Sequence, residues 1–350
     1  MRKIAPKIAA AVAAAVLSGC AARNESVPSV PNVVVVSSAP ERSQSVVSTA
    51  SSSEERSNPS VISEITSVPE ESSEITKIPE SSKITENPEP EEPYTYTSGL
   101  DNYRAKWGYN HISPSQQRLY ERFYKAAENY EIEEIELESY DVTTDDVSKA
   151  YWAFDHDNPQ FLWLGSGYHV KHTKLGARQP AVGITIDFGR SPDTVPQAEF
   201  DSIAEEVLAE AAEEATDYDK LRFIHDWIVD NTVYTYTDAK YEYEADGAVV
   251  CQKAVCEGYA KAFMYFAQSL GIECVCVIGR ANSEDHMWNL VKLYGEWYHV
   301  DVTWDDPQTS GGDGALLHTY FLVSDADIKE DHRIEVIFEL PEARNTYVQR

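Results

Sequence analysis

The distribution of aromatic residues most constrains what this chain can fold into. Residues 21–93 contain no aromatic residue, and they hold nine of the 17 prolines together with many Ser and Glu residues. Such a segment buries too little apolar surface to offset the conformational entropy that ordering costs. We therefore expect a disordered Ser/Glu/Pro-rich stalk at residues 20–98, extended by its prolines and its charge, and folded structure only from residue 99 onward.

The N-terminus is typical of an export signal. Three basic residues among the first seven precede an apolar run at residues 8–17, which is too short to span a bilayer as a helix. The run ends in Leu-Ser-Gly before Cys20, an arrangement that resembles the cleavage site of bacterial lipoproteins. This resemblance implies a lipoprotein signal peptide at residues 1–19 and a lipid on Cys20, which alone would hold an extracytoplasmic protein on the bacterial cell membrane. Ordinary secretion with an incidental cysteine is the alternative.

The net charge limits the classes of partner. The chain has 59 acidic and 29 basic residues and a formal net charge of −30. This charge repels nucleic acid and anionic lipid head groups, so we expect no DNA or RNA partner. Solubility is the simpler reason for the acidity, although a cationic substrate would also be attracted.

Residues 99–195 show the patterns of an N-terminal α+β subdomain. Ser113 followed by Pro114 predicts the start of a helix that runs to about residue 130. Apolar residues at helical spacing predict a second helix from Thr144 to the residue before Asn158. The strands that we expect here cover residues 161–164, 168–173 and 181–188.

Residues 196–350 carry the side chains with chemistry. We expect helices at 197–216 and 217–231, with Thr216 as the N-cap of the second. Near the C-terminus we expect strands at 320–323 and 336–338. The apolar run that begins at Cys256 and stops at Gly271 predicts a buried helix with the cysteine in its first turn. The unpaired N–H groups at a helix start favour a thiolate and can donate to an oxyanion.

A predicted hairpin brings a base and an acid to one face of a sheet. Two alternating strands flank a two-residue turn at 294–295. The register of this turn places His286 opposite Thr303, so that His286 and Asp301 become diagonal neighbours about 7 Å apart at the backbone. Together with Cys256, they are the nucleophile, base and orienting acid that thiol acyl transfer requires.

These segments resemble the bacterial transglutaminase-like core in their order and spacing between residues 216 and 305. The motifs are Val-Cys-Glu-Gly-Tyr-Ala-Lys at 255–261, His-Met-Trp-Asn-Leu at 286–290 and Trp-Tyr-His-Val-Asp-Val-Thr-Trp-Asp-Asp-Pro at 297–307. The resemblance implies a papain-like α+β fold, in which the helix that carries the cysteine packs on an antiparallel sheet. It also implies Cys256 as nucleophile, His286 as general base and then acid, Asp301 as orienting group, and no metal or organic cofactor.

Other residues near these motifs are weaker candidates. Gln252 and Tyr234 are candidates for a further oxyanion donor, and Asn289 for that role or for supporting the triad. Trp288, Trp304 and Tyr259 could contact substrate, with core packing as the alternative for such aromatic residues. His299 shares the face of Asp301 and is the one competitor of His286 for the role of base.

The remaining cysteines leave two alternatives open. A disulfide between Cys251 and Cys256 would disable the nucleophile, whereas Cys274 and Cys276 lie too far apart along a strand for a relaxed bridge. A zinc site made from these four cysteines and His286 matches none of the common ligand spacings.

Two functions of different classes follow. The first is an extracytoplasmic thiol enzyme that acts on a protein or peptide substrate through a thioester, as a peptidase or amidase if water resolves it, or as a cross-linking transglutaminase if an amine does. The second is a surface binding module that uses the same fold without turnover.

Overall fold

The computed structural model describes residues 100–349 except 101, 138, 140, 166, 176–178 and 308–315. The expected signal peptide, the lipidated Cys20 and the stalk lie outside the described residues. All described residues belong to one compact unit. Within this part of the chain, no helix is both long enough and apolar enough to cross a membrane.

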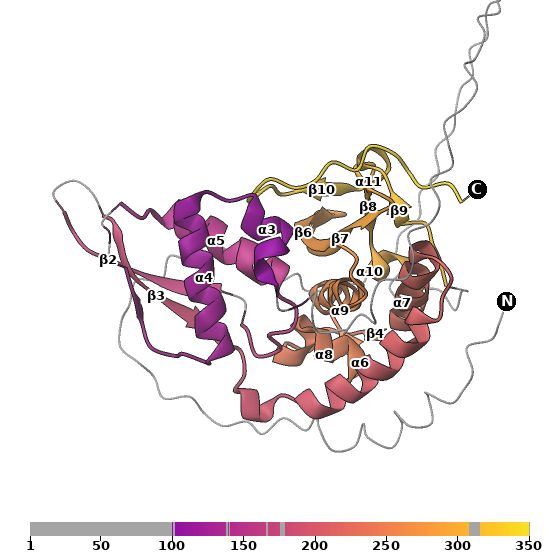
Figure 1. Ribbon diagram of the computed structural model, residues 1–350, viewed down its shortest axis with the longest axis horizontal. Coiled ribbons are helices and arrows are strands. Elements are labelled where there is room, and N and C mark those ends of the chain that lie inside the picture. Colours follow the sequence, from indigo (N-terminus) through magenta and orange to yellow (C-terminus); the bar gives the residue numbers. More distant parts are fainter. Residues whose placement is uncertain are drawn as a thin grey trace, which may run out of the picture. The chain divides into compact units, whose positions relative to one another are not determined.

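The first part of the unit packs two helices beside a small antiparallel sheet of strand order β1-β3-β2 (Figure 1). As expected, Ser113 caps the first of these helices: its hydroxyl accepts from the N–H of Gln116, whose side chain accepts from the N–H of Ser113. Thr143 and Asp146 form the same capping box on the second helix. The elements are η1 (Tyr103–Ala105), α3 (Trp107–Asn110), α4 (Pro114–Glu128), β1 (Ile135–Glu136), α5 (Thr144–Asp157), β2 (Gly167–His172), β3 (Ala181–Asp187) and η2 (Pro192–Thr194).

A layer of helices follows. The N-cap Thr216 accepts a hydrogen bond from the N–H of Asp219, which confirms the expected start of the second long helix. The elements of this layer are α6 (Gln197–Ala212), α7 (Asp217–Asn231), β4 (Val233–Tyr234), η3 (Lys240–Tyr243), α8 (Ala245–Val249), β5 (Lys253–Ala254) and α9 (Cys256–Ser269). In Figure 1, α9 lies between α6 and α8 on one side and the large sheet on the other.

The large sheet is antiparallel, with strand order β10-β6-β7-β8-β9. The hairpin of β7 and β8 has the expected turn, with positive φ at Tyr294 and Gly295, and Leu293 pairs with Glu296. The elements are β6 (Cys274–Ala281), β7 (Glu284–Leu293), β8 (Glu296–Val300), α10 (Val302–Asp305), β9 (Phe321–Val323), α11 (Asp325–Ile328) and β10 (His332–Ile334). A helix that starts with a cysteine thus packs on an antiparallel sheet, which confirms the predicted α+β fold class.

Both faces of this sheet are covered. One face packs against α9, and the other shares a core with the first part of the chain, where Trp288 and Leu290 join Phe123 and Phe154. The two parts expected at 99–195 and 196–350 are therefore joined by buried apolar surface.

Three expectations about elements are wrong. Residues 161–164 form turns, because Phe161, Leu162 and Leu164 bury their side chains without pairing as a strand. The last strand of the large sheet lies at His332–Ile334 and no strand covers residues 336–338. Thr303 does not face His286, because β8 ends at Val300 and the chain turns into α10.

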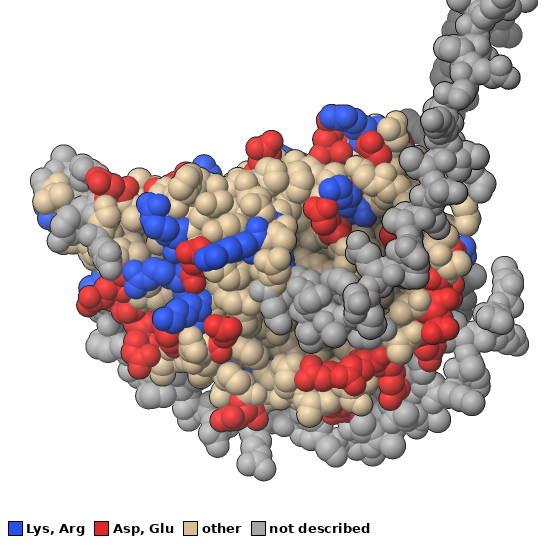
Figure 2. Space-filling view, in the orientation of Figure 1, with Lys and Arg blue, Asp and Glu red and all other residues tan. Residues whose placement is uncertain are grey.

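Charged side chains of both signs are spread over the visible surface. In Figure 2, acidic side chains gather along the lower and right margins, over α6 and α7 of Figure 1. The exposed positions of α6 are rich in Glu, whereas its buried positions include Phe200, Val207 and Leu208. This alternation is that of an amphipathic helix whose acidic face meets water.

Candidate active site

Cys256 is the first residue of α9. Its side chain is partly exposed and its thiol is free, so Cys251 and Cys256 form no disulfide. The N-cap Val255 supplies no side-chain hydrogen bond, so the first N–H groups of α9 have no partner within the helix. The nucleophile candidate therefore lies beside backbone donors and the positive end of the helix dipole.

His286 and Asp301 form a buried pair on the sheet. The Nε2 of His286, on β7, donates to the Oδ2 of Asp301 at 2.7 Å. Asp301 directly follows β8 and caps α10, where its Oδ1 accepts from the N–H of Trp304 at 3.1 Å. This geometry holds the carboxylate from two directions and leaves the Nδ1 of His286 as the nitrogen available to a thiol.

Charge stabilises the protonated imidazole. Burial alone would lower the pKa of His286, but Asp301 and then Cys256 raise it to about 10. For Asp301 burial acts in the opposite direction and would raise the pKa, but His286 and His332 hold it below its usual value. The pair is therefore an imidazolium and a carboxylate at neutral pH.

A second histidine reaches the same carboxylate. The Nε2 of His332, on β10, donates to the Oδ2 of Asp301 at 3.0 Å. Its Nδ1 lies 2.5 Å from the Oδ1 of Asp331, whose other oxygen accepts from the hydroxyl of Tyr320 at 2.5 Å. The sequence interpretation assigned no role to His332.

His299, the competitor of His286 for the role of base, forms its hydrogen bonds with residues other than Cys256 and Asp301. His299 is fully buried, accepts from the indole N–H of Trp288 at 2.9 Å and bonds to Asp325 at 2.8 Å. Both ring nitrogens are thus occupied by partners other than Cys256. His286 is the histidine whose pKa the thiol group affects.

The three aromatic candidates differ in their access to substrate. Trp288 is 1% exposed, with its ring nearly parallel to that of His286 at 5.8 Å, and Tyr259 is fully buried with its hydroxyl on Asp306. For these two side chains the structure therefore favours the alternative of core packing, because both pack inside the protein. Trp304 is half-buried, with its ring 6.0 Å from that of His286.

Two of the oxyanion candidates, Gln252 and Tyr234, precede Cys256 in the sequence. The carbonyl of Gln252 accepts from the N–H of Val233 at 3.0 Å, and Gln252 has the unusual positive φ of 54°. Tyr234 is 41% exposed, and burial and then the charge of Cys256 raise its pKa. Tyr234 thus ends β4, and Gln252 directly precedes the neighbouring strand β5.

Asn289 is part of the interface between α9 and the sheet. Its Nδ2 donates to the carbonyl of Ala260 at 3.0 Å and lies 3.6 Å from the sulfur of Cys276. The side chain is fully buried. Of the two roles expected for Asn289, this position corresponds to support of the helix and not to an oxyanion donor.

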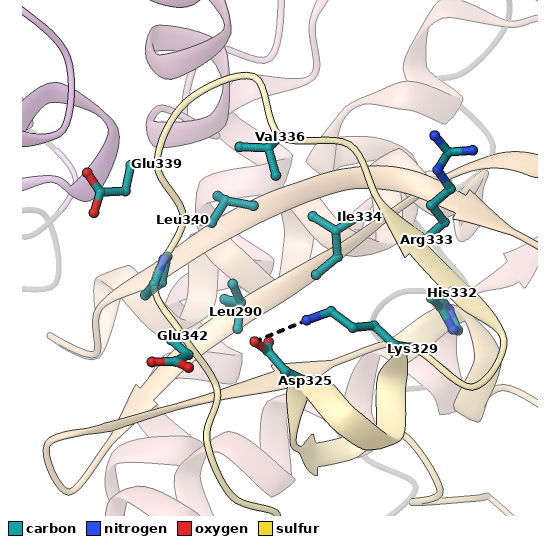
Figure 3. A pocket seen from close by; sticks show the side chains of 11 residues that line it. Leu290, Asp325, Lys329, His332, Arg333, Ile334, Val336, Glu339, Leu340 and Glu342 are labelled. Carbon is teal, nitrogen blue, oxygen red and sulfur yellow. Dashed lines mark ion pairs between the residues drawn. The ribbon is translucent and has the colours of Figure 1, made fainter.

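A pocket of about 680 Å³ opens between β7, β10 and residues 336–342. Figure 3 shows Leu290, Ile334 and Leu340 around it, with an ion pair between Asp325 and Lys329. Neither Cys256 nor His286 lines this pocket, which adjoins the catalytic candidates only through His332.

Comparison with known proteins identifies the domain. The family model described as the transglutaminase-like superfamily matches residues 202–302, which include Cys256, His286 and Asp301. Residues 202–302 therefore form a transglutaminase-like domain. The prediction of this family from the sequence is confirmed, and the superfamily consists generally of cysteine peptidases and acyltransferases.

The curated and solved relatives of the transglutaminase-like domain are distant. Human kyphoscoliosis peptidase is 30% identical over 153 residues, which are 38% of this chain and only 23% of the human protein. A crystal structure of a TGase has a TM-score of 0.29 at 14% identity, covering 39% of this chain and 45% of that chain. A putative cysteine protease from Cytophaga hutchinsonii has a TM-score of 0.27 at 14% identity, covering 40% of this chain and 67% of that chain.

Proposed function

We propose that this protein is a thiol enzyme that transfers acyl groups from amide or peptide bonds through a Cys256–His286–Asp301 triad. One observation carries the proposal. A free thiol at a helix start acts on the pKa of an imidazole whose opposite nitrogen donates to a buried carboxylate. This is the order of nucleophile, base and orienting acid that thioester chemistry uses.

The proposed reaction has two halves. In the first, the proton of the Cys256–His286 pair already lies on the imidazole, the sulfur attacks the carbonyl carbon, and the C–N bond breaks as His286 gives that proton to the leaving amine. In the second, His286 takes a proton from water or from an amine, which attacks the thioester and releases the sulfur. Asp301 keeps the imidazole oriented and stabilises its charged form in both halves.

The tetrahedral intermediate needs donors for its oxyanion. The N–H of Cys256 at the start of α9 is the first, and Gln252 or Tyr234 supplies the second. Tyr234 and the half-buried Trp304 are the aromatic side chains that we assign to substrate contact.

We propose a protein or peptide substrate and an extracytoplasmic setting. The name of the human relative, a peptidase, favours water over an amine as the second nucleophile. The lipoprotein-like N-terminus and the Ser/Glu/Pro-rich stalk support anchoring through a lipid on Cys20, which would leave the catalytic domain free to reach surface proteins.

Cysteine labelling tests this function directly. The reduced full-length protein is treated with iodoacetamide at graded pH, and labelled cysteines are located by mass spectrometry. We expect Cys256 to react much faster than the buried Cys274 and Cys276. The same protein should hydrolyse peptide amides or incorporate amines, and Cys256→Ser should do neither.

The variant His286→Ala tests whether Cys256 labels fast because His286 activates it or only because it is exposed. In this variant Cys256 stays accessible but should lose its advantage in labelling rate, because its base is gone. If wild-type Cys256 shows no such advantage and no turnover occurs, the enzyme proposal fails and the binding module takes its place.

A further inference from the structure

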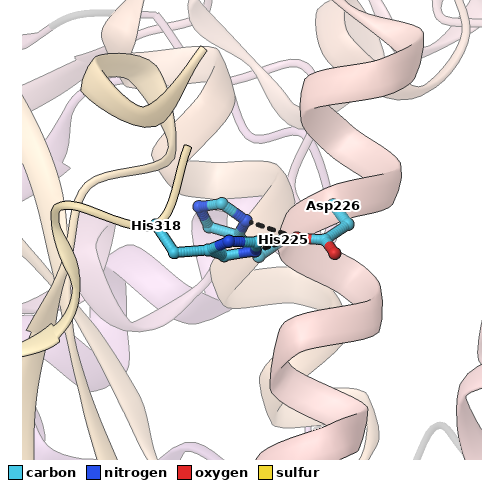
Figure 4. A group of neighbouring side chains, drawn as sticks. All are labelled: His225, Asp226 and His318. Atoms are coloured by element: carbon cyan, nitrogen blue, oxygen red, sulfur yellow. Dashed lines mark hydrogen bonds and ion pairs between the residues drawn. The ribbon is translucent and has the colours of Figure 1, made fainter. Parts of the chain in front are cut away.

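A second cluster of ligand-type side chains lies between α7 and the segment that leads into β9 (Figure 4). The Nδ1 of His225 is 3.0 Å from the Oδ1 of Asp226, and the Nε2 of His318 is 2.6 Å from the same oxygen. One nitrogen or oxygen of each residue lies within 4.8 Å of the others. Figure 4 shows the two imidazoles converging on the carboxylate from different segments of the chain.

The cluster is buried at one of its residues and partly exposed to solvent at the other two. His225 is fully buried, whereas the side chains of Asp226 and His318 are 20% and 29% exposed. Two imidazoles and one carboxylate are the donor set of zinc-type sites, and three protein ligands leave one coordination position for water. An ion could therefore reach these three ligands from the solvent.

A carboxylate on the opposite side of the ring from Asp226 fixes the orientation of His225. Its Nε2 lies 3.2 Å from the Oδ2 of Asp305, a fully buried carboxylate that also accepts from the N–H of Tyr320. A carboxylate behind a histidine fixes its tautomer and turns the opposite nitrogen toward a metal. The ring of Phe321 packs on both imidazoles, at 5.1 and 5.8 Å between ring centroids.

The ligand atoms converge on one oxygen. The Nδ1 of His225 and the Nε2 of His318 both lie within hydrogen-bonding distance of the Oδ1 of Asp226. A metal ion bound by these three residues would satisfy both nitrogens and neutralise the carboxylate.

We propose that His225, Asp226 and His318 form a binding site for a divalent transition metal ion of the zinc class, with Asp305 orienting His225. The site is distinct from the catalytic triad. Asp305 ends α10, the one-turn helix that Asp301 caps, so the bound ion braces this helix against α7.

Metal titration of the full-length chain tests the site. The protein is stripped with a chelator and titrated with Zn²⁺ against a chromophoric competitor, and then with Co²⁺, whose absorption bands report its coordination geometry. We expect one tightly bound ion per chain and a midpoint of thermal unfolding that rises with Zn²⁺ concentration.

Variants identify the ligands. His318→Ala and Asp226→Asn should each weaken Zn²⁺ binding by about 100-fold or more, because each removes a direct ligand. Asp305→Asn should weaken it by about tenfold through the orientation of His225. Two controls should bind as the wild type does: His169→Ala, which removes an exposed histidine on β2, and Cys256→Ser, which removes the partly exposed free thiol at the start of α9.

Two results would overturn the proposal. One is wild-type protein that holds no Zn²⁺ at about 10 µM free metal. The other is binding that survives both His318→Ala and Asp226→Asn or disappears in Cys256→Ser, which would place the metal elsewhere. His318 is partly exposed, so His318→Ala should fold, and circular dichroism checks this.

Discussion

At the scale of single residues, Asp301 is shared by two histidines that play unequal parts. His286 donates to its Oδ2 at 2.7 Å and His332 to the same oxygen at 3.0 Å. His286 is the histidine beside Cys256, which together with Asp301 raises its pKa. We therefore treat His332 as a positioning residue that acts on the reaction through Asp301.

Replacing His332 should slow the reaction without abolishing it. His332→Ala removes a hydrogen bond to a charged group, so we expect about a tenfold fall in kcat/KM. His332→Gln keeps an N–H donor and should recover most of the loss, and kcat/KM measured across pH checks both variants. An effect as large as that of His286→Ala would mean that His332 itself carries the proton.

The raised pKa of His286 gives stability a pH dependence of known sign. A group with a higher pKa in the folded chain stabilises the fold fully below its unfolded pKa, and this contribution is lost as pH rises through the folded pKa. For His286 these values are 6.5 and about 10. We therefore expect the free energy of unfolding to fall by on the order of 4 kcal/mol across this interval.

Urea unfolding at a series of pH values measures this fall. His286→Gln keeps Cys256 and a polar side chain but cannot be protonated, so its stability should change much less between pH 6.5 and 10. Parallel curves for the two proteins would show that His286 is not the group responsible.

The positions of the three residues of the proposed triad were predictable because each lies in a short sequence pattern with a known local structure. Cys256 starts an apolar helix, and the two-residue turn brings His286 and Asp301 to one face. His332 had no such signal, because β10 pairs with β6 across a long separation in sequence. The sequence left the role of Trp288 open, since an alternating pattern does not reveal that both faces of a strand are buried.

At the scale of elements, the position of α9 depends on a glycine in its first turn. A Cβ at Gly258 would lie 2.5 Å from the carbonyl oxygen of Glu242, which accepts from the N–H of Val255. The backbone of η3 therefore approaches the helix start that carries Cys256 more closely than any side chain allows.

Gly258→Ala should displace the start of α9. We expect the free energy of unfolding to fall by about 1–3 kcal/mol, and kcat/KM to fall by more than stability alone explains. Gly167→Ala is the matched control, because a Cβ there meets nothing within 4 Å. If both variants behave like the wild type, the backbone at Glu242 can move to accept the added methyl group, and this contact does not position Cys256.

Capped amphipathic helices were the elements best predicted from sequence. Thr216 and the apolar stripe of α7 define its observed bounds, Asp217–Asn231. Short apolar stretches were not resolved by the same reasoning: residues 161–164 are buried in turns, and the end of β8 depends on Asp301 capping α10. Burial makes such stretches apolar whether or not they pair as strands.

At the scale of the whole molecule, a buried lysine ties the two parts of the fold together. Lys261 on α9 is 2% exposed and lies 3.5 Å from Asp155 of α5, 3.0 Å from Glu244 and 3.1 Å from Glu257. Burial would lower its pKa, but these carboxylates hold it well above the usual value. Removing the cation leaves buried negative charges unpaired.

Lys261→Met should destabilise the protein as a single unit. We expect a loss of about 3–5 kcal/mol, with far- and near-ultraviolet circular dichroism reporting one coincident unfolding transition. Lys171→Met, which breaks an exposed ion pair with Glu134, should change stability little. Two separate transitions in the Lys261 variant would contradict a shared core.

The partners of Asp301 extend in a row to the surface. Hydrogen bonds run from His286 through Asp301 and His332 to Asp331, whose side chain is 31% exposed, and on to Tyr320. These hydrogen bonds form a path from His286 to the solvent that does not include the sulfur of Cys256. If an acyl group occupies that sulfur, as the proposed reaction requires, this row of hydrogen bonds still connects His286 with the surroundings.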